Sequence, residues 1–405
     1  MNFYYFIARR LGQGQKSFSS IVSQIAIVSI ALGLATVLVA FGILLGFQHN
    51  VQQKLFSFSG HMRVIKRSLS NAYENPPLSV HTRLYQQKAQ MGTVQDLYAF
   101  AQKAGILKTD TEVWGVILKG LGKDYPVERF KDNILIGKFP TLQKKGYSAE
   151  ILISKKVADR LQRQVGDSLL MFFVQDPPRF RKLRISGIYQ TGMEEFDENI
   201  ILGDINLIRR LNQWPDSLVG GYEIWAKDFT QLEEKAIPEV LDFMNYDMGL
   251  ESITDRHIDI FDWLKLLNKN VAIFLGLILV VASFNIVSIL LIMIMERVKM
   301  IGLLKALGAS NRQVRRIFIY KGLLLVLRGM GWGNALGLGF CALQYYFRLV
   351  PLNPENYYMN AVPIEWDWGI ILMVNLLTLG LIALVLLLPT LIISQILPVK
   401  AIRFD

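Results

Sequence analysis

Hydrophobic residues along this chain gather into four long runs, which are separated by segments of ordinary polar composition. A bilayer core of about 30 Å requires about 20 apolar residues in a helix that crosses it. The four runs are long enough, and they predict transmembrane helices at residues 21–47, 270–295, 322–348 and 368–396. The first run is too long for the core of a signal peptide and has no convincing cleavage site, so we interpret it as a retained signal anchor.

The segment between the first two runs, residues 48–269, has the alternation and turn signals of a soluble domain with mixed secondary structure. Runs rich in β-branched and aromatic residues predict strands at 61–65, 113–118, 168–174, 183–189 and 222–226. Helix-start and helix-stop signals predict helices at 95–104, 154–164 and 230–244. A short hairpin turn is predicted around Asp176-Pro177-Pro178-Arg179.

The distribution of charge assigns a side of the membrane to each segment. The net charge is +11, but residues 48–265 hold 29 Lys/Arg against 28 Asp/Glu. The segments 1–20, 296–321 and 397–405 carry +3, +6 and +1, and basic segments next to membrane spans face the cytoplasm. This distribution argues against nucleic-acid binding, which needs a basic face on a soluble domain. The domain at 48–269 and the short loop at 349–367 are therefore predicted to be periplasmic.

Together these patterns predict an α-helical membrane protein. It has four transmembrane helices and a large α+β periplasmic domain inserted between helices 1 and 2. The composition agrees, since 52% of the residues are hydrophobic, 19% are charged and the mean hydropathy is positive. The single cysteine, Cys341, lies in the third run and allows no intrachain disulfide.

The segment directly after the second run, ERVKMIGLLKALGAS at residues 296–310, predicts a short two-sided helix. Its apolar residues follow the i, i+3, i+4, i+7 spacing of one helix face: Met300, Leu303, Leu304 and Leu307. Its other face holds Lys299, Gly302, Lys305 and Ala306. Gly308 is a favourable residue after a helix end, and Ser310 with Gln313 forms a capping box for a following helix at 311–321.

Small and polar residues within the predicted spans indicate helix packing. Gly329, Gly333 and Gly337 recur every four residues, which lets another helix backbone approach closely. Asn285 and Asn375 lie in apolar runs, where an interhelical hydrogen bond explains an amide better than a ligand site does.

Signatures of catalysis and metal binding are missing from the sequence. It contains no G-x-x-x-x-G-K-[S/T] phosphate loop, no G-x-S-x-G nucleophile motif and no spacing of histidines that suits a metal. Four acidic residues at 194–198 lack the calcium-loop pattern and favour a solvated turn. The sequence therefore indicates neither an enzyme nor a metal or cofactor site in this chain.

Several motifs resemble a known family. Glu296-Arg297, followed by IGLLKALGAS at 301–310, is similar to the E-[K/R]-x-x-x-I-[G/A]-[I/L]-L pattern of the FtsX/MacB-type ABC transporter permeases. ASFNIVS at 282–288, Gly46-Phe47 and GIYQTGMEEFD at 187–197 resemble the lipoprotein-releasing LolC/LolE branch. The closing PVKAI at 398–402 also fits the family, and the resemblance covers nearly the whole chain.

The resemblance implies a permease subunit of an ABC transporter that releases lipoproteins from the inner membrane. The expected partners are two copies of an ATPase subunit that binds ATP and Mg²⁺, a second permease that is identical or related, and a lipid-anchored protein or periplasmic partner. It implies coupling to the ATPase through one set of residues: Glu296, Arg297, Met300, Ile301, Gly302, Leu303, Leu304, Lys305, Leu307, Gly308 and Ser310. Two alternatives stay open, a MacB-like exporter of peptides or small molecules and an FtsX-like regulator of a periplasmic hydrolase.

Overall fold

The structure, a computed structural model, describes residues 18–68, 74–109, 112–144, 146–353, 357, 359–391 and 393. The predicted cytoplasmic tail and most of the N-terminal segment lie outside these residues. The chain divides into two compact units. One is helical and contains the segments Met1–His49, Trp263–Pro351 and Ala361–Asp405, and the other is a domain made of Asn50–Asp262 with Leu352–Asn360.

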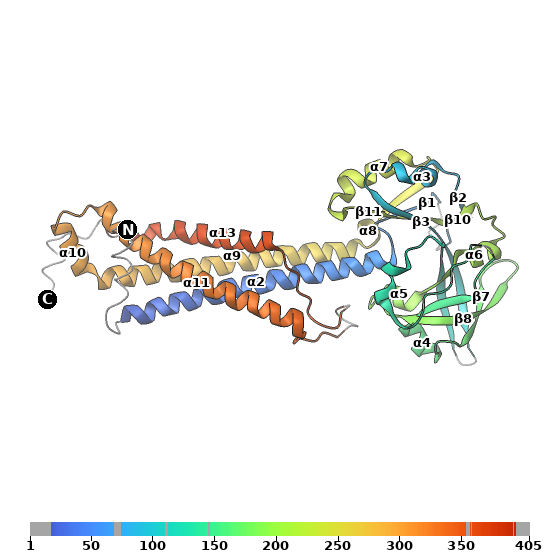
Figure 1. Cartoon of the computed structure of the whole chain (residues 1–405), viewed down its shortest axis with the longest axis horizontal. Coiled ribbons are helices and arrows are strands. Elements are labelled where there is room, and N and C mark those ends of the chain that lie inside the picture. The colour runs from blue at the N-terminus through green and yellow to red at the C-terminus, as the bar shows by residue number, and fades with distance from the viewer. Residues whose placement is uncertain are drawn as a thin grey trace. The chain divides into compact units, whose positions relative to one another are not determined.

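The helical unit is built from long apolar helices (Figure 1). Its helices are α2 (Phe18–Phe58), α9 (Ile258–Glu296), α10 (Val298–Ala306), α11 (Asn311–Phe347), α13 (Trp368–Val385) and α14 (Leu387–Thr390). Among the described residues, four helical segments are long and apolar enough to cross a membrane: Ser23–Phe58, Ile258–Glu296, Asn311–Phe347 and Trp368–Thr390. Each overlaps one of the four predicted spans.

Two helix boundaries differ from the predicted ones. The predicted helix at 311–321 does not end before the predicted span at 322–348, because α11 runs without interruption from Asn311 to Phe347. The first helix does not end at residue 47 but continues to Phe58. Val51, Leu55 and Phe58 recur at helical spacing and are buried, so an apolar face carries the helix on into the soluble domain.

The domain is organised around a ten-stranded mixed sheet. The strands of this sheet are β1 (Met62–Lys66), β3 (Val94–Lys108), β4 (Val113–Leu121), β5 (Ile134–Gly137), β6 (Glu150–Ser154), β7 (Ser168–Phe173), β8 (Arg179–Tyr189), β9 (Ile200–Asp204), β11 (Gly221–Ala226) and β12 (Met248–Ser252). Their order is β12-β1-β11-β3-β4-β9-β6-β8-β5, and β7 pairs with both β3 and β8. The pairings β3-β4-β9-β6-β8-β7-β3 therefore close a ring of six strands around part of the core.

Short helices and a second small sheet complete the domain. The helices are α3 (Arg83–Gln86), α4 (Lys155–Leu161), α5 (Glu194–Asn199), α6 (Ile205–Asn212), α7 (Ile237–Phe243) and α8 (Ile253–Arg256). The small sheet pairs β2 (Leu78–Ser79) with β10 (Leu218–Val219). Five predicted strands match β1, β4, β7, β8 and β11, and the predicted hairpin joins β7 to β8 with Phe173 opposite Arg179.

The prediction of a helix at 95–104 is wrong. These residues belong to β3, which pairs with β4, β7 and β11. The segment contains several good helix formers, but pairing on both sides outweighs the local preference.

The predicted helix at 230–244 is broken into pieces. A 3-10 turn at Phe229–Gln231 and a π-helical turn at Leu232–Ala236 precede α7, and Pro238 lies in the first turn of α7. Asp228 caps the start of this segment, since its carboxylate accepts from the Thr230 backbone N–H at 2.9 Å. The predicted helix at 154–164 is the shorter α4, whose N-cap is Ser154.

Candidate functional site

The segment at 296–310 folds as a short helix set off from its two long neighbours. Helix α9 ends at Glu296, and α10 begins after Arg297. Gly308 has φ of +92°, a conformation that glycine adopts without strain, and the Ala309 N–H donates to the Leu304 carbonyl at 2.9 Å. The Ser310 capping box is present in full, because Ser310 and Gln313 satisfy one another's backbone N–H groups.

The side chains of α10 divide into an inward and an outward set. Ile301 and Gly302 are buried, and Met300 and Leu304 are half-buried against the helical core. Leu303 and Leu307 point outward, with 56% and 77% of their surface exposed. The four apolar residues therefore do not share one environment: Met300 and Leu304 pack inward, whereas Leu303 and Leu307 are exposed.

The remaining residues of the predicted coupling set differ in exposure. Glu296, Gly308 and Ser310 are exposed, and Arg297 is half-buried. Lys305 donates through its ammonium group to the Ile393 carbonyl at 2.6 Å, which ties α10 to the chain beyond α14.

The glycine stripe of α11 faces α2. A Cβ built on Gly329 meets the Ile30 side chain at 2.8 Å, and one on Gly337 meets the Ala35 backbone at 3.0 Å. At Gly333 the nearest atoms are the Ala31 carbonyl oxygen at 2.9 Å and the Leu34 Cβ at 3.0 Å. The absence of side chains at these three positions is thus what permits the observed approach of the two helices.

Polar side chains join the same helices by hydrogen bonds. The Asn285 amide on α9 donates to the Ser29 hydroxyl on α2 at 2.9 Å. Asn334 on α11 and Asn375 on α13 donate to one another at 2.7 and 3.0 Å. Asn285 and Asn375 thus each have the interhelical hydrogen-bond partner that was predicted for an amide in an apolar run.

The last turn of α2 is held by three side chains of the domain. The carbonyl groups at a helix end lack partners within the helix. Here Trp225 Nε1 donates to the Phe56 carbonyl at 3.3 Å, and the Tyr125 hydroxyl donates to the Ser57 carbonyl at 3.2 Å. Lys119 Nζ donates to the Phe58 carbonyl at 2.6 Å. We call Lys119, Tyr125 and Trp225 the helix clamp.

Lys119 is the most constrained member of the helix clamp. It forms an ion pair with Glu223 at 2.7 Å, and the two side chains are 3% and 4% exposed. Burial lowers the pKa of Lys119, and Glu223 opposes this shift. Its ammonium group also lies 5.0 Å from the centre of the Phe58 ring, within the range of a cation–π interaction.

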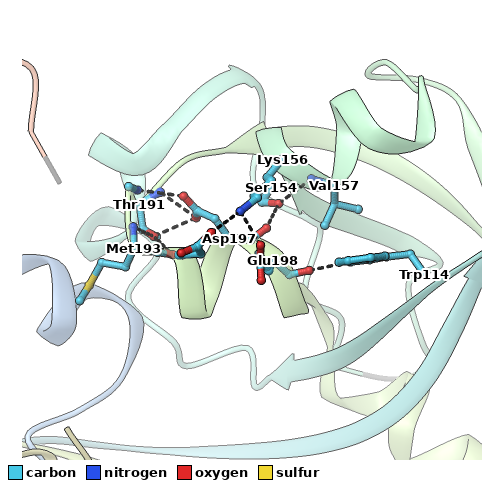
Figure 2. A network of polar contacts seen from close by, with 10 residues as sticks. Trp114, Ser154, Lys156, Val157, Thr191, Met193, Asp197 and Glu198 are labelled. Atoms are coloured by element: carbon cyan, nitrogen blue, oxygen red, sulfur yellow. Dashed lines mark hydrogen bonds and ion pairs between the residues drawn. The ribbon is translucent and has the colours of Figure 1, made fainter. Parts of the chain in front are cut away.

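A second attachment to α2 involves the acidic motif after β8, where Figure 2 shows a compact polar network. The Asp197 carboxylate accepts from the Thr191 N–H at 3.0 Å, the Thr191 hydroxyl at 2.8 Å and the Gly192 N–H at 2.9 Å. Burial raises the pKa of Asp197, and these donors oppose the rise. The Thr191 carbonyl in turn accepts from Lys54 Nζ on α2 at 2.5 Å.

The other acidic residues of this motif are also engaged by the protein itself. Lys156 forms ion pairs with Glu194 at 2.7 Å and with Glu198, and Trp114 Nε1 donates to the Glu198 carbonyl at 2.8 Å. Within the described residues no group of three or more histidine, cysteine, aspartate or glutamate side chains is arranged to hold a metal ion. The predicted turn is thus the short helix α5, in which Glu194 and Glu195 are exposed to solvent and Asp197 is buried.

The helix clamp was missed by the sequence analysis. One signal was present, since Lys119 and Glu223 are charged residues inside otherwise apolar strands, VWGVILKGL and GYEIWA. A charge in a buried strand demands an opposite charge nearby. The identity of the partner depended on the order of the strands, which the sequence does not show.

The chain is similar to known proteins along most of its length. The FtsX-like permease C-terminal family matches residues 272–398, and the MacB-like periplasmic core domain matches residues 23–234. Lipoprotein-releasing system transmembrane protein LolC of Neisseria meningitidis serogroup B is 23% identical over 96% of each chain. The corresponding LolE of Haemophilus influenzae is 21% identical over 94% of each chain. A solved structure, the periplasmic region of MacB from Actinobacillus actinomycetemcomitans, covers 51% of this chain and 95% of its own at 12% identity, with a TM-score of 0.36.

The match to the FtsX-like permease family, together with the four long apolar helices, identifies a membrane permease subunit of the ABC transporter class. This class of subunit is distinct from the ATPase subunit. Within that class, the chain belongs to the family of FtsX-like permeases that carry a MacB-like periplasmic core domain. It is therefore an inner-membrane protein with a periplasmic domain.

Proposed function

We propose that this chain is a permease subunit of an ABC transporter that releases lipid-anchored proteins from the inner membrane. Support comes from relatives that are named as lipoprotein-releasing proteins and that align with 94–96% of the chain. Such coverage includes both the helices and the domain, so neither the exporter nor the hydrolase regulator is favoured. In this proposal ATP and Mg²⁺ bind to two ATPase subunits, and a second permease completes the transporter.

The coupling path begins at α10. The exposed side chains of Leu303 and Leu307 form the surface on which an ATPase subunit docks, and Glu296 and Arg297 border it. The Ser310 capping box then starts α11, a single helix of 37 residues whose glycine stripe lies against α2. A movement of α10 is therefore delivered through packed helices, which deform less readily than loops.

The observation that carries the proposal is the continuity of α2. It is one helix of 41 residues, and its final carbonyl groups are bound by the helix clamp in the domain. A flexible linker at the end of α2 would not transmit a movement of the helix to the residues that follow it. Within the domain unit, a displacement of the last turn of α2 acts directly on Lys119, Tyr125 and Trp225 through these hydrogen bonds.

The test is ATP-dependent release of a triacylated protein from proteoliposomes that contain the complete complex. We expect release by the wild type, and lower release per ATP hydrolysed by Tyr125→Phe. That change removes one hydroxyl and costs only about 1 kcal/mol of stability. Lys108, which is exposed on β3, provides the control variant Lys108→Met.

Lys119→Met is the stronger perturbation. It leaves the Glu223 carboxylate buried without its ion-pair partner, which costs about 3–5 kcal/mol. The double variant Lys119→Met, Glu223→Met removes both charges, and we expect it to restore stability without restoring release. Undiminished release per ATP in the folded double variant would contradict coupling through the clamp, and an absence of release by the wild type would contradict the function itself.

A further inference from the structure

A polar cavity of about 320 Å³ lies beside the last turns of α2, within the domain unit. One wall is a single face of α2, because its residues follow the spacing i, i+3, i+4, i+7: Asn50, Gln53, Lys54 and Ser57. The opposite wall comes from the segment before β5, from β5 itself, from the loop after β8 and from Met359 and Asn360. A cavity of this size is at the lower end of those that hold ligands, about 300–1,000 Å³.

The cations in this cavity already have partners within the protein. Lys54 donates to the Thr191 carbonyl and lies near the Asp197 carboxylate. Arg129 is paired with Asp96. A free phosphate or a lipid phosphate would have to compete with these partners, so the cavity is poorly suited to an anion.

Besides these cations and the Asp132 carboxylate, the lining consists mainly of neutral hydrogen-bonding groups. The side-chain amides belong to Asn50, Gln53, Asn133, Gln190 and Asn360, and the amide of Asn133 donates to the Ser57 hydroxyl at 3.0 Å. Each amide carries both a donor and an acceptor, as the peptide bond does. Amide side chains from both walls therefore match the alternating N–H and C=O groups of an extended polypeptide better than they match an apolar or an ionic ligand.

The edge of the sheet next to the cavity also favours an extended chain. β5 is the last strand in the order, and no described strand pairs with its outer side. Leu135 in β5 lines the cavity and is 51% exposed, while Ile136 is 60% exposed. An exposed strand edge with apolar side chains is a template for the addition of a peptide strand.

We propose that this cavity binds the extended polypeptide segment that follows the lipid anchor of the cargo, and that the segment continues along β5. The inference rests on the proposed function. The choice of the segment next to the lipid anchor follows from the position of the cavity along α2. Asn50 and Ser57 are 3 and 10 residues beyond Phe47, where the apolar run ends. At 1.5 Å per residue this is about 5–15 Å, a distance that two to five extended residues beyond the anchor would span.

Adjacent glutamines on α2 allow a matched test. Gln53 lines the cavity, whereas Gln52 does not and points about 100° away around the helix. Single cysteines are introduced as Gln53→Cys or Gln52→Cys in a Cys341→Ala background, and the complete complex is reconstituted. The probe is a triacylated peptide with a polar Ser/Gly/Asn sequence and one cysteine, placed at successive positions after the anchor.

We expect disulfide cross-linking to Gln53→Cys to exceed that to Gln52→Cys by about tenfold or more, with a maximum a few residues beyond the anchor. Disulfide formation requires Cβ atoms within about 4.5 Å, so a segment held in the cavity brings its cysteine within reach of Gln53→Cys. Because Gln53 is exposed and Gln52 half-buried, cross-linking at each position is compared relative to its reaction with a small thiol reagent. Gln53→Ala should also weaken retention of the peptide by the complex more than Gln52→Ala does.

Three results would overturn the inference, and they separate it from the proposed function. Equal cross-linking at both positions, or none while the complex still retains the peptide, would refute the cavity but leave lipoprotein release intact. Protection of Gln53→Cys from a small thiol reagent by peptide-free vesicles of phosphatidylethanolamine and phosphatidylglycerol would identify a lipid headgroup as the occupant. A failure to retain or release the peptide at all would refute both.

Discussion

Replacing Gly333 by alanine tests the contact between α11 and α2 most directly. The added Cβ would lie 2.9 Å from the Ala31 carbonyl oxygen and 3.0 Å from the Leu34 Cβ. Favourable separations between carbon atoms are about 3.5–4.0 Å, so the two helices would have to separate by about 0.5–1 Å. The atoms in the way include backbone, which cannot rotate aside as a long side chain would.

The cost follows from these contacts. Overpacking of a close interface typically costs about 1–3 kcal/mol, whereas alanine gains about 1 kcal/mol over glycine in helix propensity. Gly331 lies on the same helix with no atom within 4 Å of its built Cβ, so Gly331→Ala retains the gain and avoids the cost. The two variants should therefore differ by about 1–3 kcal/mol in the free energy of unfolding, with Gly331→Ala the more stable.

The assay is thermal unfolding of the purified protein in detergent, followed by tryptophan fluorescence. A lower midpoint for Gly333→Ala than for Gly331→Ala is expected, and Gly333→Leu should lower it further and reduce the yield of the complex. Equal midpoints for the two alanine variants would refute the reasoning, since they would show that α2 yields at no cost or does not pack there.

Three further outcomes are expected. Leu303→Asp should weaken binding of the ATPase by at least the 1.5–3 kcal/mol that burial of a leucine contributes, as measured by co-purification, whereas Lys299→Ala should leave binding near the wild-type level. Burial chiefly lowers the pKa of His61 from 6.5 to about 4, so neutral His61 contributes fully to the free energy of unfolding above pH 6.5, and about 3 kcal/mol is lost as the pH falls towards 4. The His61→Gln variant should lack this loss, and a free energy of unfolding that is equally sensitive to this pH range in the variant would contradict the assignment. Cysteine in place of Ser217 should react with an impermeant maleimide in intact spheroplasts, and cysteine in place of Ser310 should not; the reverse labelling would invert the assigned orientation.

Some features of the candidate site were readable in the sequence because their causes are local. The Ser310–Gln313 capping box and the stop at Gly308 involve residues within one turn of each other, and both are present. The glycines of α11 recur at a spacing that implies a helix contact. The sequence did not reveal that α2 would be the partner.

Other features depended on residues far apart in the chain. The segment 95–104 was predicted to be a helix and is instead part of β3, because β11 and β4 supply backbone partners that cannot be identified from the sequence of the segment alone. The cavity beside α2 likewise arises from segments that the fold assembles.

By itself, the sequence determined the membrane class, the four apolar helices and the soluble domain between the first two. Water and lipid act on each stretch of residues separately, so long apolar runs reveal their environment without knowledge of the fold. The tertiary structure alone decided that α2 extends to Phe58 and that Lys119, Tyr125 and Trp225 bind its last carbonyl groups. These donors are 61 to 169 residues from their acceptors, and a hydrogen bond forms only when folding has brought both atoms within about 3 Å.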